Sequence, residues 1–286
     1  MLSTIHALYS RRVRTLLSHQ MHQLKEDENF DTSEQEVSFN LDDFLVGNAP
    51  STIHYIPGFL SLEEEEYLLE KVNDAPKPKW VHLANRRLQQ WGGLVGKRSL
   101  ISDGPLPFWL SNLIDRICQL RSSSESSVSA SFPASNRPNH VLINEYTSGQ
   151  GIMPHTDGPA FFPLVSTISL GSHTLLDFYE HVNGRAGDQK QVDISPEHRR
   201  YLGSMHLEPR SLILIRDHAY STLLHGIEEK KSDVLGEKHI FNKCEVQPNS
   251  NIKDDEELER STRISLTIRN VPLVNTKLLS KLIGQS

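Results

Sequence analysis

Short runs in which apolar and polar side chains alternate with a period of two dominate the second half of the chain. Such alternation is typical of β-strands that bury one face. The runs fall at residues 140–146, 164–170, 173–180, 205–215, 220–225 and 262–270, and clusters of Gly, Pro, Asn and Asp separate them. Because strands follow one another without alternating helices, the pattern indicates an all-β sandwich or barrel rather than a βαβ fold.

Two helical patterns precede these strands. Ser61 and Glu64 form a capping box, which predicts a helix over residues 62–73. A second helix is predicted over residues 107–120, where one stripe is apolar. The members of that stripe are Leu110, Leu113, Ile114, Ile117 and Leu120. We expect both helices to support one sheet, so their apolar stripes are core and do not contact a cofactor.

The last alternating run, residues 262–270, has a polar face that carries two arginines. Its polar members are Arg263, Ser265, Thr267 and Arg269, and its apolar members are Ile264, Leu266 and Ile268. If the polar face points inward, an anion is needed there, because a buried guanidinium without a partner is strongly destabilising. The alternative is a strand whose polar face is simply solvated.

Three residues have the types and positions of a metal-binding set. His155 and Asp157 are two residues apart, so on an extended chain their side chains point the same way. His225 ends a later strand at a glycine, where its side chain can reach inward. Two histidines and one carboxylate with open coordination positions suit non-heme Fe(II). Taken alone, the first pair is better explained by a surface His and Asp in a turn, and it is the order of motifs along the chain that favours the metal.

The motifs occur in a fixed order along the chain. They are Asn144 and Tyr146, then His155 and Asp157, then His225, then Arg263 through Arg269. This order resembles the AlkB family of Fe(II)- and 2-oxoglutarate-dependent dioxygenases, whose pattern is N-x-Y, H-x-D, a distal H and R-x-[NS]-L-T-x-R. The resemblance covers residues 50–275. It implies a mainly β fold with flanking helices, built on a double-stranded β-helix (jelly-roll) core with iron at its open mouth.

The resemblance also implies roles for individual residues. His155, Asp157 and His225 would bind one Fe(II), with 2-oxoglutarate as co-substrate and O2 as oxidant. The residues expected to hold 2-oxoglutarate are Asn144, Tyr146, Arg263, Ser265 and Arg269, with Arg263 on the distal carboxylate and Arg269 nearer the metal. The implied activity is oxidative demethylation of N-methylated nucleic acid, releasing formaldehyde, succinate and CO2. Two alternatives remain open: a nucleic-acid-binding or regulatory protein with weak turnover, and a hydroxylase or demethylase of proteins.

A basic segment before the metal motif is the candidate substrate-binding region. Residues 76–101 contain six Lys and Arg residues and no acid. Trp80, His82 and Trp91 lie between these basic residues. Basic and aromatic residues together can bind phosphates and stack on bases. The alternative is a solvated loop whose tryptophans belong to the core. The resemblance implies a nucleotide-recognition lid here, with Lys77, Lys79, Arg86, Arg87, Trp91, Lys97 and Arg98 as candidate contacts and single-stranded nucleic acid, preferably RNA, as the partner.

Length and composition set the domain organisation. With 286 residues and 37% hydrophobic content, the chain fits one domain with extensions. We expect a disordered N-terminal extension at 1–48, a helical buttress and lid at 49–135, a dioxygenase core at 136–275 with a loop insertion at 228–261, and a tail at 276–286. The serine-rich stretch 122–136 and the charged insertion are predicted surface loops.

Charge and targeting signals constrain partners and compartment. The net charge of −6 argues against broad electrostatic attraction to nucleic acid. Two cysteines cannot form a disulfide framework. The sequence contains no apolar span of 18 residues, which argues against a membrane protein. We therefore expect a monomer of the cytoplasm and nucleus that does not bind membranes. Residues 1–24 contain three arginines and no acid, so an organelle transit peptide is the alternative to a dispensable extension.

Overall fold

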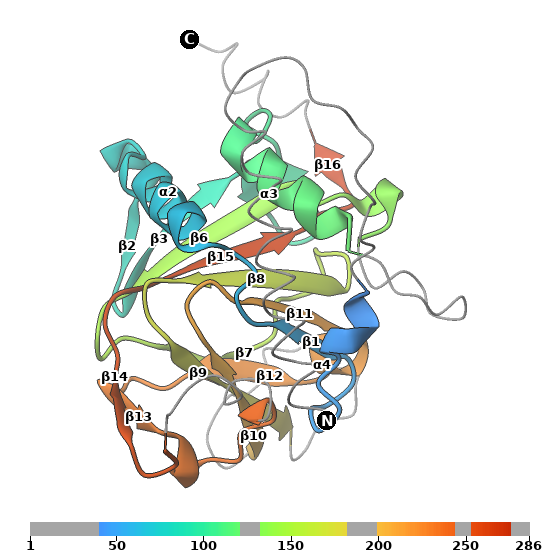
Figure 1. Ribbon diagram of the computed structural model, residues 1–286. Helices are drawn as coiled ribbons and strands as arrows, with labels where there is room; N and C mark the ends of the chain where they lie inside the picture. The colour runs from blue at the N-terminus through green and yellow to red at the C-terminus, as the bar shows by residue number, and fades with distance from the viewer. Residues whose placement is uncertain (1–39, 121–131, 182–198, 244–252, 276–286) are drawn as a thin grey trace, which may run out of the picture.

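The computed structural model describes residues 40–120, 132–181, 199–243 and 253–275, and two antiparallel sheets form its centre (Figure 1). The major sheet contains, in spatial order, β1 (Ile53–Ile56), β11 (Leu212–Arg216), β8 (Leu164–Leu170), β15 (Arg263–Arg269), β6 (His140–Tyr146), β3 (Arg86–Trp91) and β2 (Val81–Leu83). The minor sheet contains β10 (Arg199–Leu207), β9 (Thr174–His181), β12 (Leu224–Ile227) and β7 (Ile152–His155). This architecture is the jelly-roll core that the family resemblance implied, and it agrees with the all-β pattern of the sequence.

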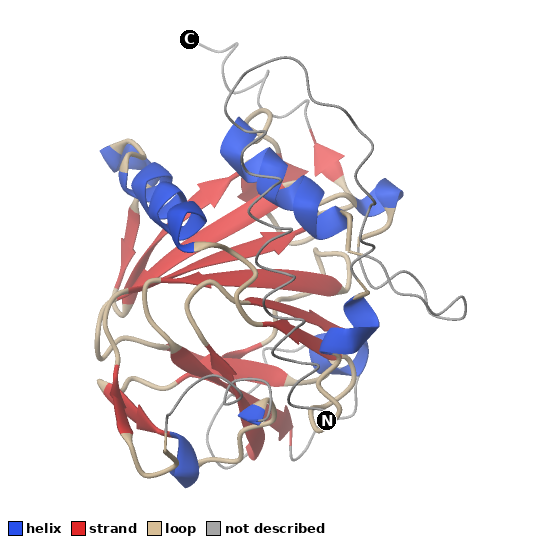
Figure 2. Cartoon of the chain, in the orientation of Figure 1, coloured by secondary structure: helices blue, strands red, loops and turns tan. Residues whose placement is uncertain are grey.

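The remaining elements are short or peripheral (Figure 2). Two further small sheets pair β13 (Ser232–Val234) with β14 (Glu257–Glu259), and join β16 (Val274–Asn275), β5 (Leu100–Ile101) and β4 (Leu94–Val95). The helices are α2 (Leu62–Asn73), α3 (Phe108–Cys118) and α4 (Asp217–Ser221), with 3-10 turns η1 (Leu41–Phe44), η2 (Lys77–Lys79), η3 (Ala134–Asn136) and η5 (Leu235–Glu237). No helix in these described parts of the chain is long and apolar enough to span a membrane.

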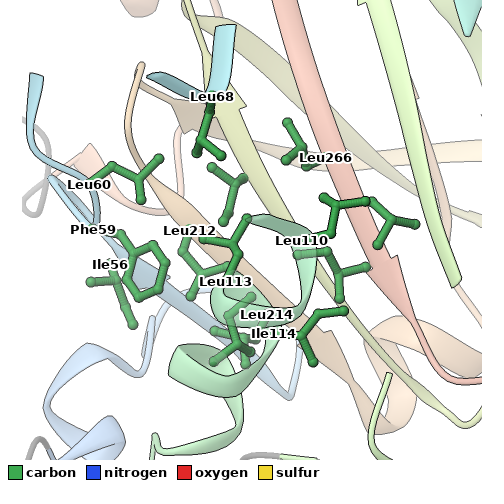
Figure 3. Packing of buried hydrophobic residues seen from close by; sticks show 14 of the residues in the cluster. Ile56, Phe59, Leu60, Leu68, Leu110, Leu113, Ile114, Leu212, Leu214 and Leu266 are labelled. Atoms are coloured by element: carbon green, nitrogen blue, oxygen red, sulfur yellow. The ribbon is translucent and has the colours of Figure 1, made fainter. Parts of the chain in front are cut away.

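Both predicted helices are confirmed, and both cover the outer face of the major sheet. The capping box of α2 is complete: Ser61 N–H donates to Glu64 Oε2 at 2.6 Å, and Glu64 N–H donates to Ser61 Oγ at 3.2 Å. The apolar stripe of α3 is buried on the sheet, where Leu110, Leu113 and Ile114 meet Leu212, Leu214 and Leu266 (Figure 3). The helices therefore close a hydrocarbon core on this side of the sheet.

The alternation in β15 separates two environments. Ile264, Leu266 and Ile268 belong to the core under the helices. The opposite side chains face the minor sheet, and each is directly opposite a residue of β6: Arg263 pairs with Tyr146, Ser265 with Asn144 and Arg269 with His140. Directly opposite residues share a face. The polar face of the last alternating run is therefore an inner wall of the jelly roll rather than a solvated surface.

Several strand boundaries differ from the predicted ones. The run 205–215 is the end of β10 followed by β11, and the run 220–225 is the end of α4 followed by β12. The break between β10 and β11 includes Arg210, whose φ of 64° lies in the left-handed region. The short strands β1 to β5 and β7 were not predicted, because two to six residues carry too little alternation to be recognised.

The structure describes the chain from residue 40, and some residues before the expected boundary at 49 are buried. Within η1 and the residues after it, Leu41 is fully buried and Val46 is 2% exposed. The preceding residues 1–39, which include the candidate transit segment, lie outside the described residues, as do residues 122–131 of the predicted serine-rich loop and the predicted tail 276–286.

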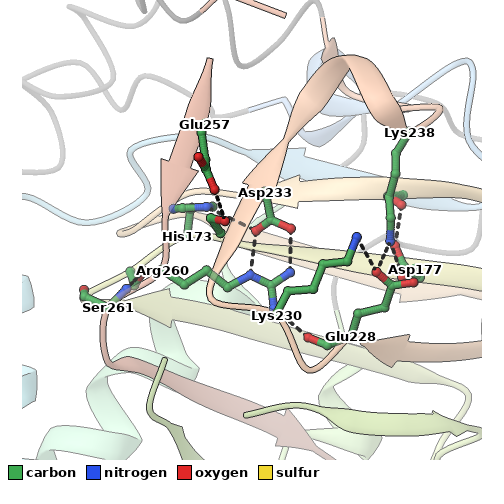
Figure 4. Close-up of polar contacts among 12 residues, drawn as sticks. His173, Asp177, Glu228, Lys230, Asp233, Lys238, Glu257, Arg260 and Ser261 are labelled. Carbon is green, nitrogen blue, oxygen red and sulfur yellow. Dashed lines mark hydrogen bonds and ion pairs between the residues drawn. The ribbon is translucent and has the colours of Figure 1, made fainter. Parts of the chain in front are cut away.

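The insertion at 228–261 is more structured, where it is described, than its charged composition predicted. One buried ion pair joins two residues of the insertion, and a second ion pair attaches the insertion to β9 of the minor sheet (Figure 4). Arg260 donates to both carboxylate oxygens of Asp233, at 2.5 and 2.7 Å, and Lys238 Nζ lies 2.7 Å from Asp177 of β9. Charges that read as solvated in the sequence are therefore paired, because buried charges require partners.

Candidate metal centre and anion pocket

Three candidate metal ligands come together at the end of the minor sheet. His155 is the last residue of β7, and β12 places His225 directly opposite it. Asp157 follows β7 by two residues. Ligand atoms of the three side chains all lie within 4.8 Å of one another, and this is the single such group of three or more His, Cys, Asp or Glu residues among those described. The set fits a divalent metal with two imidazoles, one carboxylate and open positions.

Hydrogen bonding selects the metal-binding nitrogen of His155. Its Nδ1 lies 2.8 Å from the carbonyl oxygen of Met153. Because a carbonyl can only accept, Nδ1 carries the proton, and the lone pair is on Nε2. A backbone acceptor of this kind fixes the tautomer and ring orientation of a metal-binding histidine.

The charge states of the other two ligands also suit metal binding. Burial and the neighbouring His155 lower the pKa of His225 to about 4, so its imidazole is neutral at physiological pH. Burial alone would raise the pKa of Asp157, but Arg269, His225 and His155 outweigh it and hold the pKa below its ordinary value. The carboxylate therefore keeps its negative charge in a buried site.

Arg269 is the partner that holds this carboxylate. Its Nη1 donates to Oδ1 of Asp157 at 2.7 Å, and the two side chains are 7% and 8% exposed. The guanidinium also stacks on Phe161, with its central carbon 4.1 Å from the ring centroid. This contact occupies one carboxylate oxygen and leaves Oδ2 for a metal.

Arg263, at the other end of the same strand face, has no acidic partner among the described residues. It is 4% exposed, and its Nη2 donates to Ser169 Oγ at 2.9 Å. Burial lowers its pKa to about 10, and Tyr146 opposes that effect, so the group remains a cation at neutral pH. The Nε atom is buried without a hydrogen-bond partner in this part of the chain. An unneutralised buried cation marks a site for an anion.

A pocket next to Arg263 could receive that anion. The residues that line it are Tyr146, Thr147, Gln150, His173, Thr174, Ile227, Arg260, Ser261 and Arg263. Arg260 is already neutralised by Asp233, so Arg263 is the cation available to a ligand. Ser265 and Asn144 continue the same inner wall toward the metal, because Ser265 is opposite both Asn144 and Ser169. The structure thus brings all five candidate co-substrate residues onto one wall.

The seven candidate lid residues do not share one surface. Strand β3 pairs with β6, so that Leu88 is opposite Asn144 and Arg87 is opposite Glu145. Arg86 therefore lies on the inner face with Asn144, and Arg87 and Trp91 lie on the helix side. Arg87 donates to both oxygens of Glu145, at 2.6 and 2.7 Å, and stacks on Trp80.

The other lid residues divide in the same way between scaffold and surface. Trp91 packs edge-on against Trp109, and Lys79 lies over the Trp91 ring at 4.5 Å. Lys77, Lys97 and Arg98 are exposed. Lys79 also lies 3.5 Å from Asp103. The two tryptophans pack against the core, as the alternative interpretation of this segment expected.

Sequence reasoning did not single out His140. It begins β6 directly opposite Arg269 and is 1% exposed. Burial and Arg269 lower its pKa to about 3, and neither ring nitrogen has a hydrogen-bond partner among the described residues. The period of two that links His140 to Asn144 and Tyr146 was the signal that could have placed it on the inner wall.

The chain resembles known proteins across most of its length. A family model described as "2OG-Fe(II) oxygenase superfamily" matches residues 26–269. A zebrafish (Danio rerio) protein named "Probable RNA/DNA demethylase ALKBH6" is 43% identical over 235 residues, which cover 82% of this chain and 92% of the relative. An Arabidopsis thaliana protein named "Alkylated DNA repair protein ALKBH8 homolog" is 27% identical, over 65% of this chain and 53% of the relative.

Solved structures resemble the chain more distantly. One described as "The structure of OsALKBH1" has a TM-score of 0.48 and 14% sequence identity, and the match covers 76% of this chain and 97% of that one.

Proposed function

We propose that this chain, which belongs to the 2OG-Fe(II) oxygenase superfamily, removes methyl groups from nitrogen atoms of single-stranded nucleic acid, preferably RNA. The observation that carries the oxygenase chemistry is that β15 connects two incomplete sites: Arg269 contacts Asp157 of the metal set, and Arg263 lies on the same face of the strand. One is a set of two imidazoles and a carboxylate suited to Fe(II), and the other is a buried arginine without an acid, suited to a carboxylate of 2-oxoglutarate. Neither site is satisfied by the protein alone.

In this proposal His155, Asp157 and His225 hold the metal, which when bound supplies the oxidising power of the reaction by activating O2. Arg263 binds the distal carboxylate of 2-oxoglutarate through a planar pair of donors. Tyr146, Asn144 and Ser265 position the co-substrate between Arg263 and the metal. Arg269 keeps the Asp157 carboxylate charged and fixes its orientation.

Support for the nucleic-acid substrate comes from the relatives and from the lid. The zebrafish relative carries the name of a demethylase of RNA or DNA. Hydroxylation of an N-methyl carbon gives a hemiaminal whose C–N bond breaks, so the methyl carbon leaves as formaldehyde and the nitrogen regains a proton. Equal amounts of succinate and CO2 arise from 2-oxoglutarate. Release of formaldehyde therefore distinguishes demethylation from stable hydroxylation.

Which lid residues contact nucleic acid follows from whether each side chain is exposed or faces the helix side of the major sheet. We propose that the exposed Lys77, Lys97 and Arg98 contact phosphates, whereas Arg87 and Trp91 support the lid from the helix side. Each phosphate contact adds to the salt dependence of binding. Charge reversal at Lys97 and Arg98 should therefore reduce the salt slope of oligonucleotide binding, measured by gel shift at two salt concentrations. Arg87→Gln, which retains the exposed cations, is the matched control and should leave the slope nearly unchanged.

The function is tested with a panel of substrates. Methylated RNA, methylated single-stranded DNA and methylated peptides are incubated with the full-length protein, Fe(II), ascorbate and 2-oxoglutarate, and mass spectrometry follows substrate and product. The proposal expects demethylated RNA with stoichiometric formaldehyde, and no product with a His155→Ala, Asp157→Ala variant. Oxidised peptides alone would assign the activity to proteins, and succinate without an oxidised product would favour a weakly active binding protein.

Two further expectations accompany the proposal. A monomer is expected, and light scattering of the purified chain tests it. Location in the cytoplasm and nucleus, rather than in an organelle, is tested by imaging the full-length chain beside a variant that starts at Met21.

A further inference from the structure

We propose that Arg86 is a positioning residue of the co-substrate site, which turns the NH2 group of the Asn144 side chain toward 2-oxoglutarate, and that it is not a nucleic-acid contact. The inference rests on the proposed co-substrate role of Asn144. It assigns Arg86 to a different task from the other basic residues between 76 and 101.

The geometry begins with the pairing of β3 and β6. Arg86 shares the inner face with Leu88, which is directly opposite Asn144. From this position the Arg86 Nε–H donates to Oδ1 of Asn144 at 3.1 Å. The bond joins residues 58 positions apart in the chain, and the carboxamide that receives it is 5% exposed.

The chemistry of a carboxamide makes this bond directional. One end of the Asn144 side chain is a carbonyl that accepts hydrogen bonds, and the other is an NH2 that donates two. A guanidinium can only donate hydrogen bonds, so the carbonyl end of the Asn144 side chain must face Arg86. The NH2 end then points away from Arg86. The structure gives that NH2 group no hydrogen-bond partner among the described residues, so its donors are available to a carboxylate or keto oxygen.

Without Arg86 the amide could rotate by 180° at little steric cost. The carbonyl oxygen would then face the ligand, and two acceptors would meet without a proton between them. A buried acceptor left without a donor is destabilising. The guanidinium therefore selects the orientation of Asn144 that binds an anionic ligand and disfavours the one that repels it.

A second observation places Arg86 near Tyr146, one of the residues that line the pocket next to Arg263. Burial raises the pKa of Tyr146, and both Arg263 and Arg86 act in the opposite direction. The Tyr146 hydroxyl is thus within electrostatic range of both guanidinium groups. No acid neutralises Arg86 in the part of the chain that the structure describes, so it retains its charge beside a pocket proposed to receive a dicarboxylate.

The adjacent residue Arg87 provides a matched control. It lies on the same strand and carries the same side chain, but it faces the helix side and pairs with Glu145. Replacing either arginine with glutamine removes one positive charge from β3. Only the change at Arg86 removes the guanidinium that donates to Asn144.

The test is calorimetric titration of 2-oxoglutarate into Fe(II)-loaded, full-length protein under anaerobic conditions. Arg86→Gln should weaken binding about tenfold, which corresponds to about 1.4 kcal/mol, and Arg87→Gln should change it less than about twofold. In an Asn144→Ala background most of the Arg86→Gln effect should disappear, because the two residues act as one unit. The same background should leave the small Arg87→Gln effect unaltered.

The outcomes separate this inference from the proposed function. The unmodified protein should bind 2-oxoglutarate, and Arg263→Lys should lower that affinity. If Arg86→Gln nevertheless binds 2-oxoglutarate with unchanged affinity, the inference on Arg86 is overturned and the proposed function stands. Additive effects of Arg86→Gln and Asn144→Ala would also overturn it, as would a reduced salt slope for oligonucleotides in Arg86→Gln with unchanged 2-oxoglutarate affinity. Should Arg86→Gln fold poorly, Arg86→Lys should fold, keep the charge and bind 2-oxoglutarate with intermediate affinity.

Discussion

Two arginines on one face of β15 show how the two ends of the site differ. Arg269 and Arg263 are six residues apart, both are nearly inaccessible to solvent, and both face the interior of the jelly roll. Arg269 is neutralised by Asp157, an acid of the chain itself. Arg263 has a serine hydroxyl and the ring of Tyr146 nearby, but no acid among the described residues.

The two arginines show which charge the protein itself supplies and which charge a ligand must supply. At the metal end, the Asp157 carboxylate contacts Arg269 and also borders the candidate metal position. Here the protein itself supplies the negative charge. At the opposite end the fold supplies a cation alone. Retaining a buried charge without a partner is strongly unfavourable unless a ligand neutralises it. A dicarboxylate that reaches from Arg263 to a metal would complete both ends at once.

The largest effect is expected at the metal end. Asp157→Ala removes a candidate metal ligand and leaves Arg269 buried without its acid. We expect loss of bound iron and of turnover, and destabilisation of about 3–5 kcal/mol in the metal-free protein, as for a broken buried ion pair. Metal analysis and urea unfolding measure the two effects. Stoichiometric iron in this variant would contradict the ligand assignment.

The opposite face of β15 should respond in stability alone. Leu266 is fully buried under the helices, so Leu266→Ala should lower the free energy of unfolding by about 2–5 kcal/mol. Because its side chain points away from the site, the folded variant should bind 2-oxoglutarate with unchanged affinity. Urea unfolding and calorimetry check the two statements, and a large loss of affinity in the folded variant would show that the two faces are not independent.

Arg263→Lys tests the end that lacks an acid. The charge remains, but an ammonium cannot reproduce the planar pair of donors. We expect 2-oxoglutarate affinity to fall by about 1.5–3 kcal/mol, which is roughly tenfold to a hundredfold, with iron binding nearly intact. Equal calorimetric affinity for the two proteins would remove Arg263 from the co-substrate site.

A smaller effect of pH is expected from a buried histidine that is neither a candidate metal ligand nor a candidate co-substrate residue. Burial, with a contribution from His173, lowers the pKa of His206 on β10 to about 4. Between about pH 6.5 and pH 4 the unfolded chain binds a proton that the folded chain does not, so stability falls as the pH falls. His206 should account for about 1–2 kcal/mol of the stability lost between pH 7 and pH 5.

His206→Leu isolates this contribution. It should lose less stability between pH 7 and pH 5 than the unmodified protein, as measured by urea unfolding at each pH. An identical loss in both proteins would show that His206 is not held in its neutral form.

Much of the fold was predictable from local patterns. The capping box of Ser61 and Glu64 and the stripe on α3 gave two helices, and the alternation in β15 assigned each of its faces. The pairing of β3 with β6 was not predictable, because it depends on contacts between residues about 58 positions apart that leave no local period. The same lack of local signal concealed the ion pairs of the insertion.

The site shows the same limit at the level of single residues. The order of motifs predicted the candidate ligands and the inner wall, and the structure brings these residues together. Sequence composition grouped Arg86 with Arg87, although adjacent residues of a strand point to opposite faces. Once Arg86 to Trp91 is known to be a strand, the period of two places Arg86 on the face opposite to Arg87 and Trp91. The missing information was secondary structure, not chemistry.

The most direct measurement is calorimetry of 2-oxoglutarate binding to the unmodified protein with and without Fe(II), under anaerobic conditions. We expect one 2-oxoglutarate to bind per chain in the presence of the metal, and binding too weak to measure without the metal or in a His225→Ala variant. Binding of equal strength with and without Fe(II) would show that the metal and Arg263 do not hold opposite ends of one co-substrate.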